Sequence, residues 1–439
     1  MHVCIPITEN LVDNLGGNYV LYSVYLEGFM FFKARYRDLH FWDEQMRDIF
    51  KNQIPTFPPK YYLAMTSKMA EERRVLLKQY LQEVFSDPVV SNSDVFITGV
   101  QKLQMDTFQM PPTDVILKVY LPNGRLVNVE SKTSDIAERV LESHVQVVHT
   151  FSYPRPYDEC GQPYANSGAL QGPQNAALHK ISLSRELVEF FGLFITHKDP
   201  NNIFSVVKRV VPFEIPFLTI WNVNNEAFQI DIRKWYMSPS NDAMLMGCSV
   251  AVDILYAQAV QEFGMNWCRP TEQQKTALQE LLKTNDKFKI LAFMQQIEHY
   301  SYQRMDPSVS DYQDANTMVT ISVGKDELYC SFKISDRTEI MNLHISKISA
   351  WDVLLHQPEK DRDQQELKLE YMDENVLKWI TIWTNQGFLI STWLKKMVSE
   401  QQVVSTKENL EIEDNGTSAN SSRKQKKDDG HTKQGSTSS

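Results

Sequence analysis

Three short stretches near the N-terminus decide the fold of the first domain: Arg35-Tyr36-Arg37-Asp38, Phe57-Pro58-Pro59-Lys60 and Glu72-Arg73-Arg74, the last followed by Tyr80. Each stretch places cations beside an aromatic residue or a proline turn. A guanidinium grips a phosphate through two parallel hydrogen bonds, a lysine on a rigid turn adds a second positive charge, and an aromatic ring offers a flat face to a sugar. Any one stretch alone is common, because two prolines usually mark only a turn. The three together predict a site for an inositol phosphate headgroup.

The order and spacing of these stretches resemble the Phox homology (PX) domain, a phosphoinositide-binding module. The resemblance implies that Arg35 holds the 3-phosphate and that Tyr36 stacks under the inositol ring. It also implies that Lys60 contacts the 1-phosphate and that Arg73 binds the ring hydroxyls. Arg73 is chosen because the family places its arginine seven residues before an aromatic residue, here Tyr80. Some PX domains keep the fold without binding lipid, but all four contact residues are present in this chain.

An apolar patch, Tyr61, Tyr62 and Leu63, follows Lys60 directly. One interpretation is that these side chains belong to the core. The other is that the loop dips into the lipid interface, where apolar burial adds to headgroup affinity.

The composition is typical of a soluble globular protein, with 42% hydrophobic and 23% charged residues among 439. This length predicts two to four domains. A net charge of −10 argues against nucleic acid as a partner, yet residues 30–80 carry ten Lys/Arg against six Asp/Glu. The five cysteines are scattered, which predicts reduced thiols in the cytosol and no metal site. No signal peptide or membrane-spanning run is found, so membrane contact is expected to be peripheral.

Residues 113–237 read as a ubiquitin-like unit. A hairpin at 115–129 is followed by a crossover helix at 136–141, and strands are expected near 191–196, 205–210 and 227–235. Between them, at about 144–176, prolines and glycines are too dense for a helix, which predicts an inserted and disordered loop. The following residues, 177–181, resemble the resumption of the crossover helix.

The rest of the chain divides into a helical part, a strand-rich part and a tail. Apolar stripes at helical spacing over 241–303 predict a small helical bundle. From residue 318 strands are expected at 319–323, 328–334, 341–345, 348–355, 367–371 and 379–383. A final helix over 386–401 makes this part resemble a PTB/PH-like sandwich. From residue 403 onward the low-complexity composition predicts a disordered tail.

A ubiquitin-like lobe, a helical lobe and a PTB/PH-like lobe in this order resemble a FERM module of atypical kind, and the whole chain resembles the PX-FERM sorting nexins. The expected fold is α+β and multidomain. The expected units are a PX domain at 1–108, a ubiquitin-like lobe at 113–237 with its insert, a helical lobe at 238–305, a PTB/PH-like lobe at 316–402 and a disordered tail at 403–439.

The resemblance also implies a function. Sorting nexins of this group are recruited to early endosomes by phosphatidylinositol 3-phosphate, and their third lobe binds NPxY-type motifs in receptor tails, integrins included, which steers cargo to recycling rather than lysosomal degradation. A peptide reader of this kind adds an extended peptide to an exposed sheet edge. By resemblance the edge is the strand around Trp351 and Val353, and the closing helix, with Leu389 and Trp393, forms the other wall of the groove. The alternative is that these side chains are core.

Other function classes remain as alternatives. Enzyme signatures such as a phosphate-binding glycine loop or a G-x-S-x-G elbow are absent from the sequence, so no catalytic residue or cofactor is expected. A FERM-type linker between membrane and cytoskeleton is a second hypothesis, which predicts a plasma-membrane lipid preference. A signalling scaffold that binds a small GTPase through the ubiquitin-like lobe is a third.

Overall fold

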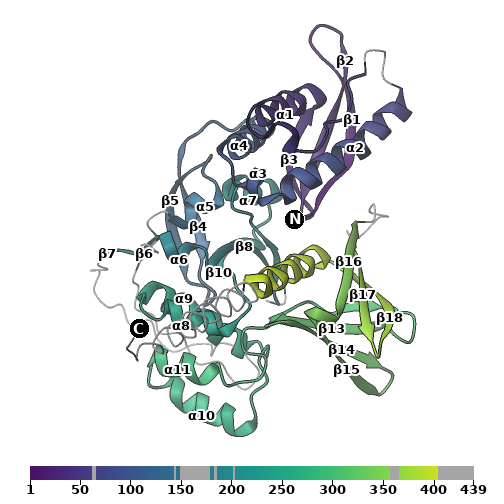
Figure 1. Cartoon of the computed structure of the whole chain (residues 1–439). Coiled ribbons are helices and arrows are strands. Elements are labelled where there is room, and N and C mark those ends of the chain that lie inside the picture. Colours follow the sequence, from purple (N-terminus) through teal and green to yellow (C-terminus); the bar gives the residue numbers. More distant parts are fainter. Residues whose placement is uncertain are drawn as a thin grey trace, which may run out of the picture.

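The computed structural model describes residues 1–61, 66–142, 145–148, 178–181, 185–200, 203–355 and 365–403. These residues form an N-terminal domain that stands above three lobes (Figure 1). No helix within them is long and apolar enough to cross a membrane.

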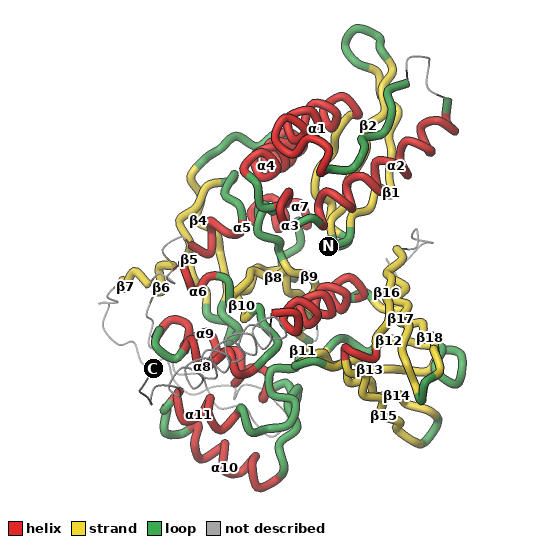
Figure 2. Tube along the Cα trace, viewed as in Figure 1, coloured by secondary structure: helices red, strands yellow, loops and turns green. Residues whose placement is uncertain are grey.

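The N-terminal domain is a small antiparallel sheet, of order β1-β2-β3, packed against helices (Figure 2). Glu27 and Gly28, both with positive φ, make the tight turn between β2 and β3. Thr66 and Ser93 cap the helices α2 and α4, respectively, by accepting from backbone N–H groups. The elements are β1 Val3–Val12, β2 Asn18–Leu26, β3 Phe29–Arg35, α1 Tyr36–Phe50, η1 Lys51–Gln53, α2 Ser67–Ser86, α3 Pro88–Ser91 and α4 Asp94–Phe108.

The first lobe is built on a seven-stranded sheet of order β7-β6-β5-β4-β10-β8-β9. The β4–β5 hairpin lies where the sequence predicts it, and β10 runs parallel to β4 at the centre of the sheet. The elements are β4 Asp114–Tyr120, β5 Leu126–Lys132, α5 Ala137–Glu142, β6 Val145–Val148, β7 Leu178–Ile181, α6 Arg185–Val188, β8 Phe191–Lys198, β9 Phe204–Arg209, α7 Pro216–Val223 and β10 Phe228–Lys234.

The expectation that the crossover helix resumes at 177–181 is wrong. Leu178–Ile181 is the strand β7, which pairs antiparallel with β6 along its whole length. A partner strand from the other side of the interruption therefore decides its conformation. Of the predicted disordered insert at 144–176, residues 145–148 form β6, and the remainder lies outside the described residues.

The second lobe is a set of helices: η2 Pro239–Asn241, α8 Asp242–Leu245, α9 Ser249–Gly264, α10 Glu272–Leu282 and α11 Lys287–Met294. It shares one hydrophobic core with the first lobe, since Leu255 and Leu291 belong to the same buried cluster as Leu193. Asp242 joins the two lobes, because its carboxylate accepts hydrogen bonds from the hydroxyls of Tyr236 and Tyr300.

The third lobe is a strongly bent sheet of order β15-β14-β13-β12-β18-β17-β16, with β11 paired to β13, closed by a helix at residues 387–403. The strands are β11 Gln303–Arg304, β12 Ser308–Ser310, β13 Thr317–Gly324, β14 Glu327–Ile334, β15 Arg337–His344, β16 Ile348–Leu355, β17 Gln365–Asp373 and β18 Val376–Thr384, with η3 Ile345–Lys347 before β16. The predicted disordered tail lies outside the described residues from 404 onward.

The N-terminal domain and the first lobe share side chains at their contact. Val211 and Phe213, from the segment after β9, belong to the buried cluster of the N-terminal domain. The Phe213 ring meets Phe85 and Phe96 edge to face, with centroid distances of 5.6 and 5.0 Å. Gln104 of α4 adds a hydrogen bond between the two units, because its Oε1 accepts from the backbone N–H of Ile215. The core of the N-terminal domain is thus completed by a residue more than a hundred positions away.

A buried ion pair lies at the same contact. Nζ of Lys208 on β9 is 2.8 Å from Oε1 of Glu214, and it also donates to the backbone oxygen of Leu26 in the N-terminal domain. Thr219 donates a further hydrogen bond to the Glu214 carboxylate. Because the charges are paired and hydrogen-bonded, their burial is tolerated.

Candidate lipid pocket and peptide groove

Arg35 stands at the point where β3 ends and α1 begins. Its backbone N–H donates to Oδ2 of Asp38, which fixes the first turn of α1. Its guanidinium lies over the ring of Tyr19 on the neighbouring strand, with the central carbon 3.4 Å from the ring centroid. The aromatic face therefore holds this cation at the N-terminal end of a helix, where the helix dipole favours an anion.

Arg73 lies between two aromatic rings. Its guanidinium carbon is 4.1 Å from the centroid of Tyr36 and 4.4 Å from that of Tyr61, and the residue is only 4% exposed. The Tyr36 hydroxyl donates to the backbone oxygen of Pro58, which holds the proline turn against α1. One face of Tyr36 thus carries the Arg73 cation, so this tyrosine positions the arginine as well as flanking the pocket.

Neighbouring Arg74 has a different role. Its Nε and a terminal nitrogen donate to the two carboxylate oxygens of Glu71, at 2.8 and 2.6 Å, and its other terminal nitrogen donates to the backbone oxygen of Ile5. Arg74 therefore ties α2 to β1. Of the two adjacent arginines, only Arg73 is placed beside Tyr36.

The lysine and the loop after it are the less defined part of the pocket. Lys60 is exposed at the end of the proline turn, and Tyr61 contacts Arg73 as described. Tyr62 and Leu63, which the sequence suggests for membrane insertion, lie outside the described residues.

A buried polar group supports the pocket from behind, and sequence reasoning missed it. Tyr80 of α2 donates to Oδ1 of Asp43 at 2.6 Å, and Nε of Arg47 donates to Oδ2 of the same carboxylate at 2.8 Å. Arg47 also donates to the backbone oxygen of Pro55. Burial, followed by the hydrogen bond to Asp43, raises the pKa of Tyr80, so its hydroxyl remains a donor. The i,i+4 spacing of Asp43 and Arg47 was the available signal. Tyr19 was also missed, and its partner Arg35 is too distant in sequence to reveal it.

The predicted peptide edge is an edge strand of the third lobe. β16 pairs with β17 and ends the strand order of the sheet, which leaves one row of its backbone groups for another strand. Trp351 and Val353 lie on the same face of β16, toward the closing helix, because side chains alternate along a strand. Trp351 is half-buried, and its indole Nε1–H donates to Oγ of Ser391 at 2.8 Å. Val353 is buried beneath the start of the helix, where a Cβ on Gly387 would lie 3.1 Å from it.

Leu389 and Trp393, the two helix residues expected to line the groove, are core residues. Each is 2% exposed. The Trp393 ring stacks on Phe194 of the first lobe at 5.8 Å and contacts Trp235 at 4.6 Å. The Trp393 side chain therefore points to the first lobe, and Leu389, one helical turn before it, is buried in the same hydrophobic cluster. As placed here, neither offers surface to a peptide.

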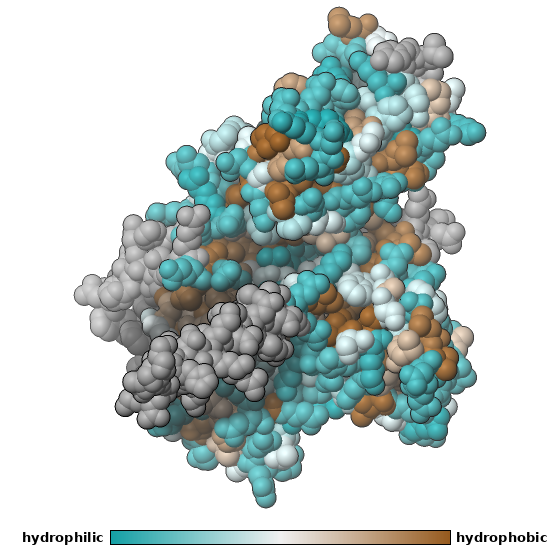
Figure 3. All heavy atoms as spheres, viewed as in Figure 1, coloured by the Kyte–Doolittle hydropathy of each residue, from teal (hydrophilic) through white to brown (hydrophobic). Residues whose placement is uncertain are grey.

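Exposed hydrophobicity alone does not locate the groove. Trp379 on β18 is 58% exposed, more than Trp351, yet it lies on a paired strand away from the sheet edge. Figure 3 shows the apolar side chains of the face in view in several separate groups rather than one patch. The argument for the groove therefore rests on the edge strand and the adjacent helix.

Comparison with known proteins shows which protein families this chain is similar to. The family model for the PX domain matches residues 29–98, that for the F1 lobe of the sorting nexin 17/27/31 FERM domain matches 174–237, and that for the sorting nexin 17 FERM C-terminal domain matches 301–402. The chain is 48% identical over 420 residues to sorting nexin-31 of Xenopus laevis, which covers 94% of this chain and 90% of the relative. The chain belongs to the sorting nexin-31 family.

Relatives of lower identity also match over most of this chain. Sorting nexin-31 of Homo sapiens is 38% identical over 422 residues, covering 94% of this chain and 88% of that protein. Sorting nexin-17 of Homo sapiens is 28% identical over 418 residues, covering 92% and 82%. The N-terminal domain is therefore a PX domain, and the three lobes after it form a FERM module of the kind found in this family.

Proposed function

We propose that this chain is an endosomal sorting adaptor. It binds phosphatidylinositol 3-phosphate through the PX domain and NPxY-type receptor tails, such as those of integrins, through the third lobe. It works in the cytoplasm as a peripheral protein of early endosome membranes and directs cargo to recycling. The observation that carries the proposal is the pair of arginines, Arg35 and Arg73, each held on tyrosine rings beside the start of α1.

The chemistry of the pocket supports a phosphorylated inositol. Both guanidiniums lie against aromatic faces, and a planar guanidinium matches the geometry of a phosphate or of neighbouring ring hydroxyls. Lys60 on the proline turn supplies a further positive charge at the rim. In this proposal Arg35 contacts the 3-phosphate, Lys60 the 1-phosphate and Arg73 the ring hydroxyls, with Tyr36 beside the ring.

The lipid test uses the full chain and phosphatidylcholine vesicles in three forms: without phosphoinositide, with phosphatidylinositol 3-phosphate, and with phosphatidylinositol 4,5-bisphosphate. Co-sedimentation is measured for the wild type, Arg35→Ala, and the matched control Arg37→Ala, whose side chain is exposed and pairs with Asp38. Losing a charge-assisted contact costs about 1.5–3 kcal/mol, so Arg35→Ala should weaken binding roughly 10- to 150-fold. Arg37→Ala should bind as the wild type does.

Two outcomes count against the lipid assignment. If Arg35→Ala retains wild-type affinity for the 3-phosphate vesicles, the pocket is assigned to the wrong residues. If the bisphosphate vesicles bind more tightly than the 3-phosphate vesicles, the membrane–cytoskeleton linker becomes the better hypothesis.

The third lobe is proposed to read peptides by strand addition. An extended NPxY-type peptide pairs with the free edge of β16, so that main-chain hydrogen bonds supply affinity and the half-buried Trp351 supplies a side-chain contact. Val353 forms part of the base of this proposed groove. The support is the edge position of β16 beside the closing helix.

Calorimetric titration of an NPxY peptide into the full chain tests this site. Trp351→Ala should raise the dissociation constant at least tenfold, since a central aromatic contact of an interface is commonly worth more than about 1.4 kcal/mol. Trp379→Ala, a tryptophan of the same sheet away from its edge, is the matched control and should leave the affinity unchanged. Absence of heat with the wild type, or equal affinities for the wild type and Trp351→Ala, would refute the groove.

A further inference from the structure

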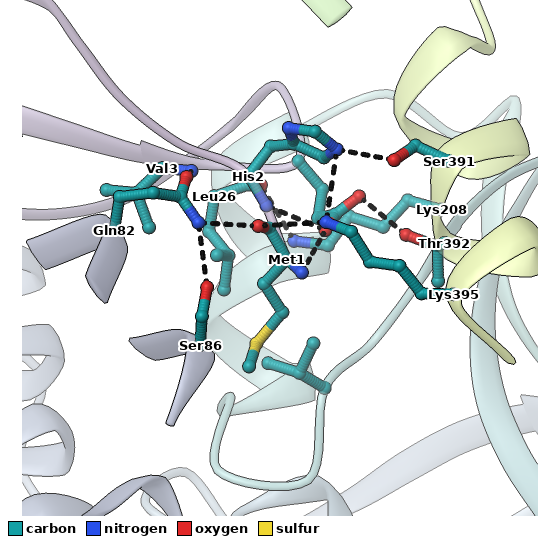
Figure 4. Close-up of polar contacts among 12 residues, drawn as sticks. Met1, His2, Val3, Leu26, Gln82, Ser86, Lys208, Ser391, Thr392 and Lys395 are labelled. Atoms are coloured by element: carbon teal, nitrogen blue, oxygen red, sulfur yellow. Dashed lines mark hydrogen bonds and ion pairs between the residues drawn. The ribbon is translucent and has the colours of Figure 1, made fainter. Parts of the chain in front are cut away.

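The first residues of the PX domain lie against the closing helix of the third lobe, although the two segments are nearly four hundred positions apart. Nε2 of His2 is 2.7 Å from Oγ of Ser391 (Figure 4). The His2 ring also lies 5.1 Å from that of Phe388. In Figure 1 the N-terminus lies beside this helix, which is coloured yellow-green, and β16 lies near the right-hand end of the helix. The contact therefore joins the PX domain to a wall of the proposed groove.

The hydroxyl of Ser391 is shared between His2 and the groove residue Trp351. The indole N–H of Trp351 can only donate, so Ser391 Oγ accepts from it at 2.8 Å. Nζ of Lys395, which can only donate, lies 3.4 Å from Nε2 of His2, so Nε2 is an acceptor and the Ser391 hydroxyl donates its hydrogen to it. Ser391 is fully buried, so water does not replace either partner. The result is a continuous relay, Trp351 to Ser391 to His2, that runs from the groove into the PX domain.

The charges around His2 agree with its role as acceptor. Nζ of Lys395 is 3.4 Å from Nε2 of His2, which disfavours a second positive charge on the ring. Burial, followed by the charges of Lys395, the N-terminal amine and Lys78, lowers the pKa of His2 to about 2. The imidazole is thus neutral, with Nε2 free of a proton and able to accept from Ser391.

A second contact holds the two surfaces together. Glu27, in the tight turn of the PX domain, accepts from the backbone N–H of His2 through Oε1 and from the hydroxyl of Thr392 through Oε2. Gly28 of the same turn lies against Phe388, with 3.6 Å between that ring and a Cβ added to the glycine. The PX domain therefore docks on the same turn of the helix to which Trp351 is bonded.

We propose that His2 is a positioning residue of the peptide groove: through Ser391, the docked PX domain fixes the Trp351 indole in the orientation that receives an extended peptide. The inference rests on the proposed peptide site and adds its control by the PX domain. Because hydrogen bonds in a buried relay strengthen one another, removal of the last acceptor loosens the first donor. By linkage, a peptide in the groove in turn strengthens the docking of the PX domain.

The experiment uses the full chain and compares wild type, His2→Ala, His2→Gln and His344→Ala. Glutamine keeps an acceptor at the place of Nε2, so it is the rescue variant. His344 is a histidine on β15, the opposite edge of the same sheet, and serves as the control. Two quantities are measured: the dissociation constant of an NPxY peptide by calorimetry, and the indole N–H resonance of Trp351 in the free protein, assigned with Trp351→Phe.

We expect His2→Ala to raise the dissociation constant about three- to tenfold, the usual range for one buried hydrogen bond, and to shift the Trp351 indole resonance. His2→Gln should restore both quantities, and His344→Ala should change neither. The proposal is overturned if the wild type binds peptide while His2→Ala has the same affinity, or if the indole resonance stays in place. An equal loss in His2→Gln also overturns it, because the acceptor would then not be the cause. A wild type that binds no peptide instead defeats the proposed function itself.

Discussion

Phe213 gives the sharpest quantitative prediction, because it belongs to the first lobe by sequence and to the PX domain by packing. It is 3% exposed and meets three rings of the PX core, those of Phe31, Phe85 and Phe96, at 6.2, 5.6 and 5.0 Å. Truncation of a buried phenylalanine costs about 3–5 kcal/mol, and edge-to-face contacts of this kind contribute about 0.5–1.5 kcal/mol each. Phe213→Ala should therefore lower the opening free energy of the PX domain by about 4 kcal/mol.

Amide hydrogen exchange on the full chain measures this loss where it occurs. A change of about 4 kcal/mol accelerates exchange by about a thousandfold. The slow amides of α2 and α4 should show it, because Phe85 and Phe96 lie on these helices. The matched control is Phe41→Ala, a phenylalanine of the PX surface that is 60% exposed and should change stability by less than about 0.5 kcal/mol. Acceleration below tenfold in α2 and α4, with loss of protection in the first lobe instead, would refute the shared core.

Three further predictions concern the packing and charges of the same module. Gly99→Ala should lower the melting temperature and reduce the free energy of unfolding by about 1–3 kcal/mol, because the added Cβ would lie 2.2 Å from the buried ring of Trp42. An unchanged melting temperature would contradict this close contact between α4 and α1. Glu214→Leu should lower the free energy of unfolding, measured with urea, by about 3–5 kcal/mol, because it leaves the Lys208 ammonium buried without a counter-charge. Adding Lys208→Met to this variant should recover part of the loss. Acidification from pH 7.5 to 5.5 should weaken docking of the PX domain, and His2 should contribute about 1.4 kcal/mol of this loss: its pKa is lowered to about 2 when docked and is about 6.5 when released, so only the released state takes up a proton below pH 6.5. The N-terminal amine, whose pKa burial lowers to about 5, weakens docking in the same direction. The difference in urea midpoint between the two pH values should shrink in His2→Gln, and an equal difference in both proteins would contradict this source.

Sequence reasoning succeeded where the determining contacts are local. The hairpin predicted at 115–129 is formed by β4 and β5, because its turn and its apolar alternation are both local features. The first strand, Val3–Val12, was missed because only its first half is buried, so its apolar alternation is weak. Residues 178–181 were assigned to a helix because their pairing with β6 is not visible locally.

The candidate sites show the same division. The residues of the candidate lipid pocket were proposed from motif spacing and family resemblance. Their mutual arrangement could not be predicted, since Tyr19 and Arg35 meet only when β2 and β3 pair. For the closing helix, the helical spacing of the apolar residues identified the face that contains Leu389 and Trp393. It could not tell whether that face meets a peptide or the first lobe, which depends on how the lobes pack.

The insertion of Phe213 into the PX core also changes what counts as a unit of this protein. A fragment that ends near residue 110 would have the complete PX sequence but an open hole where that ring belongs, so its lipid affinity would be measured on a weakened fold. For the same reason the PX domain is poorly suited to being exchanged between proteins as a free-standing cassette. Recombination that preserves it would have to carry the segment around residue 213 along with it.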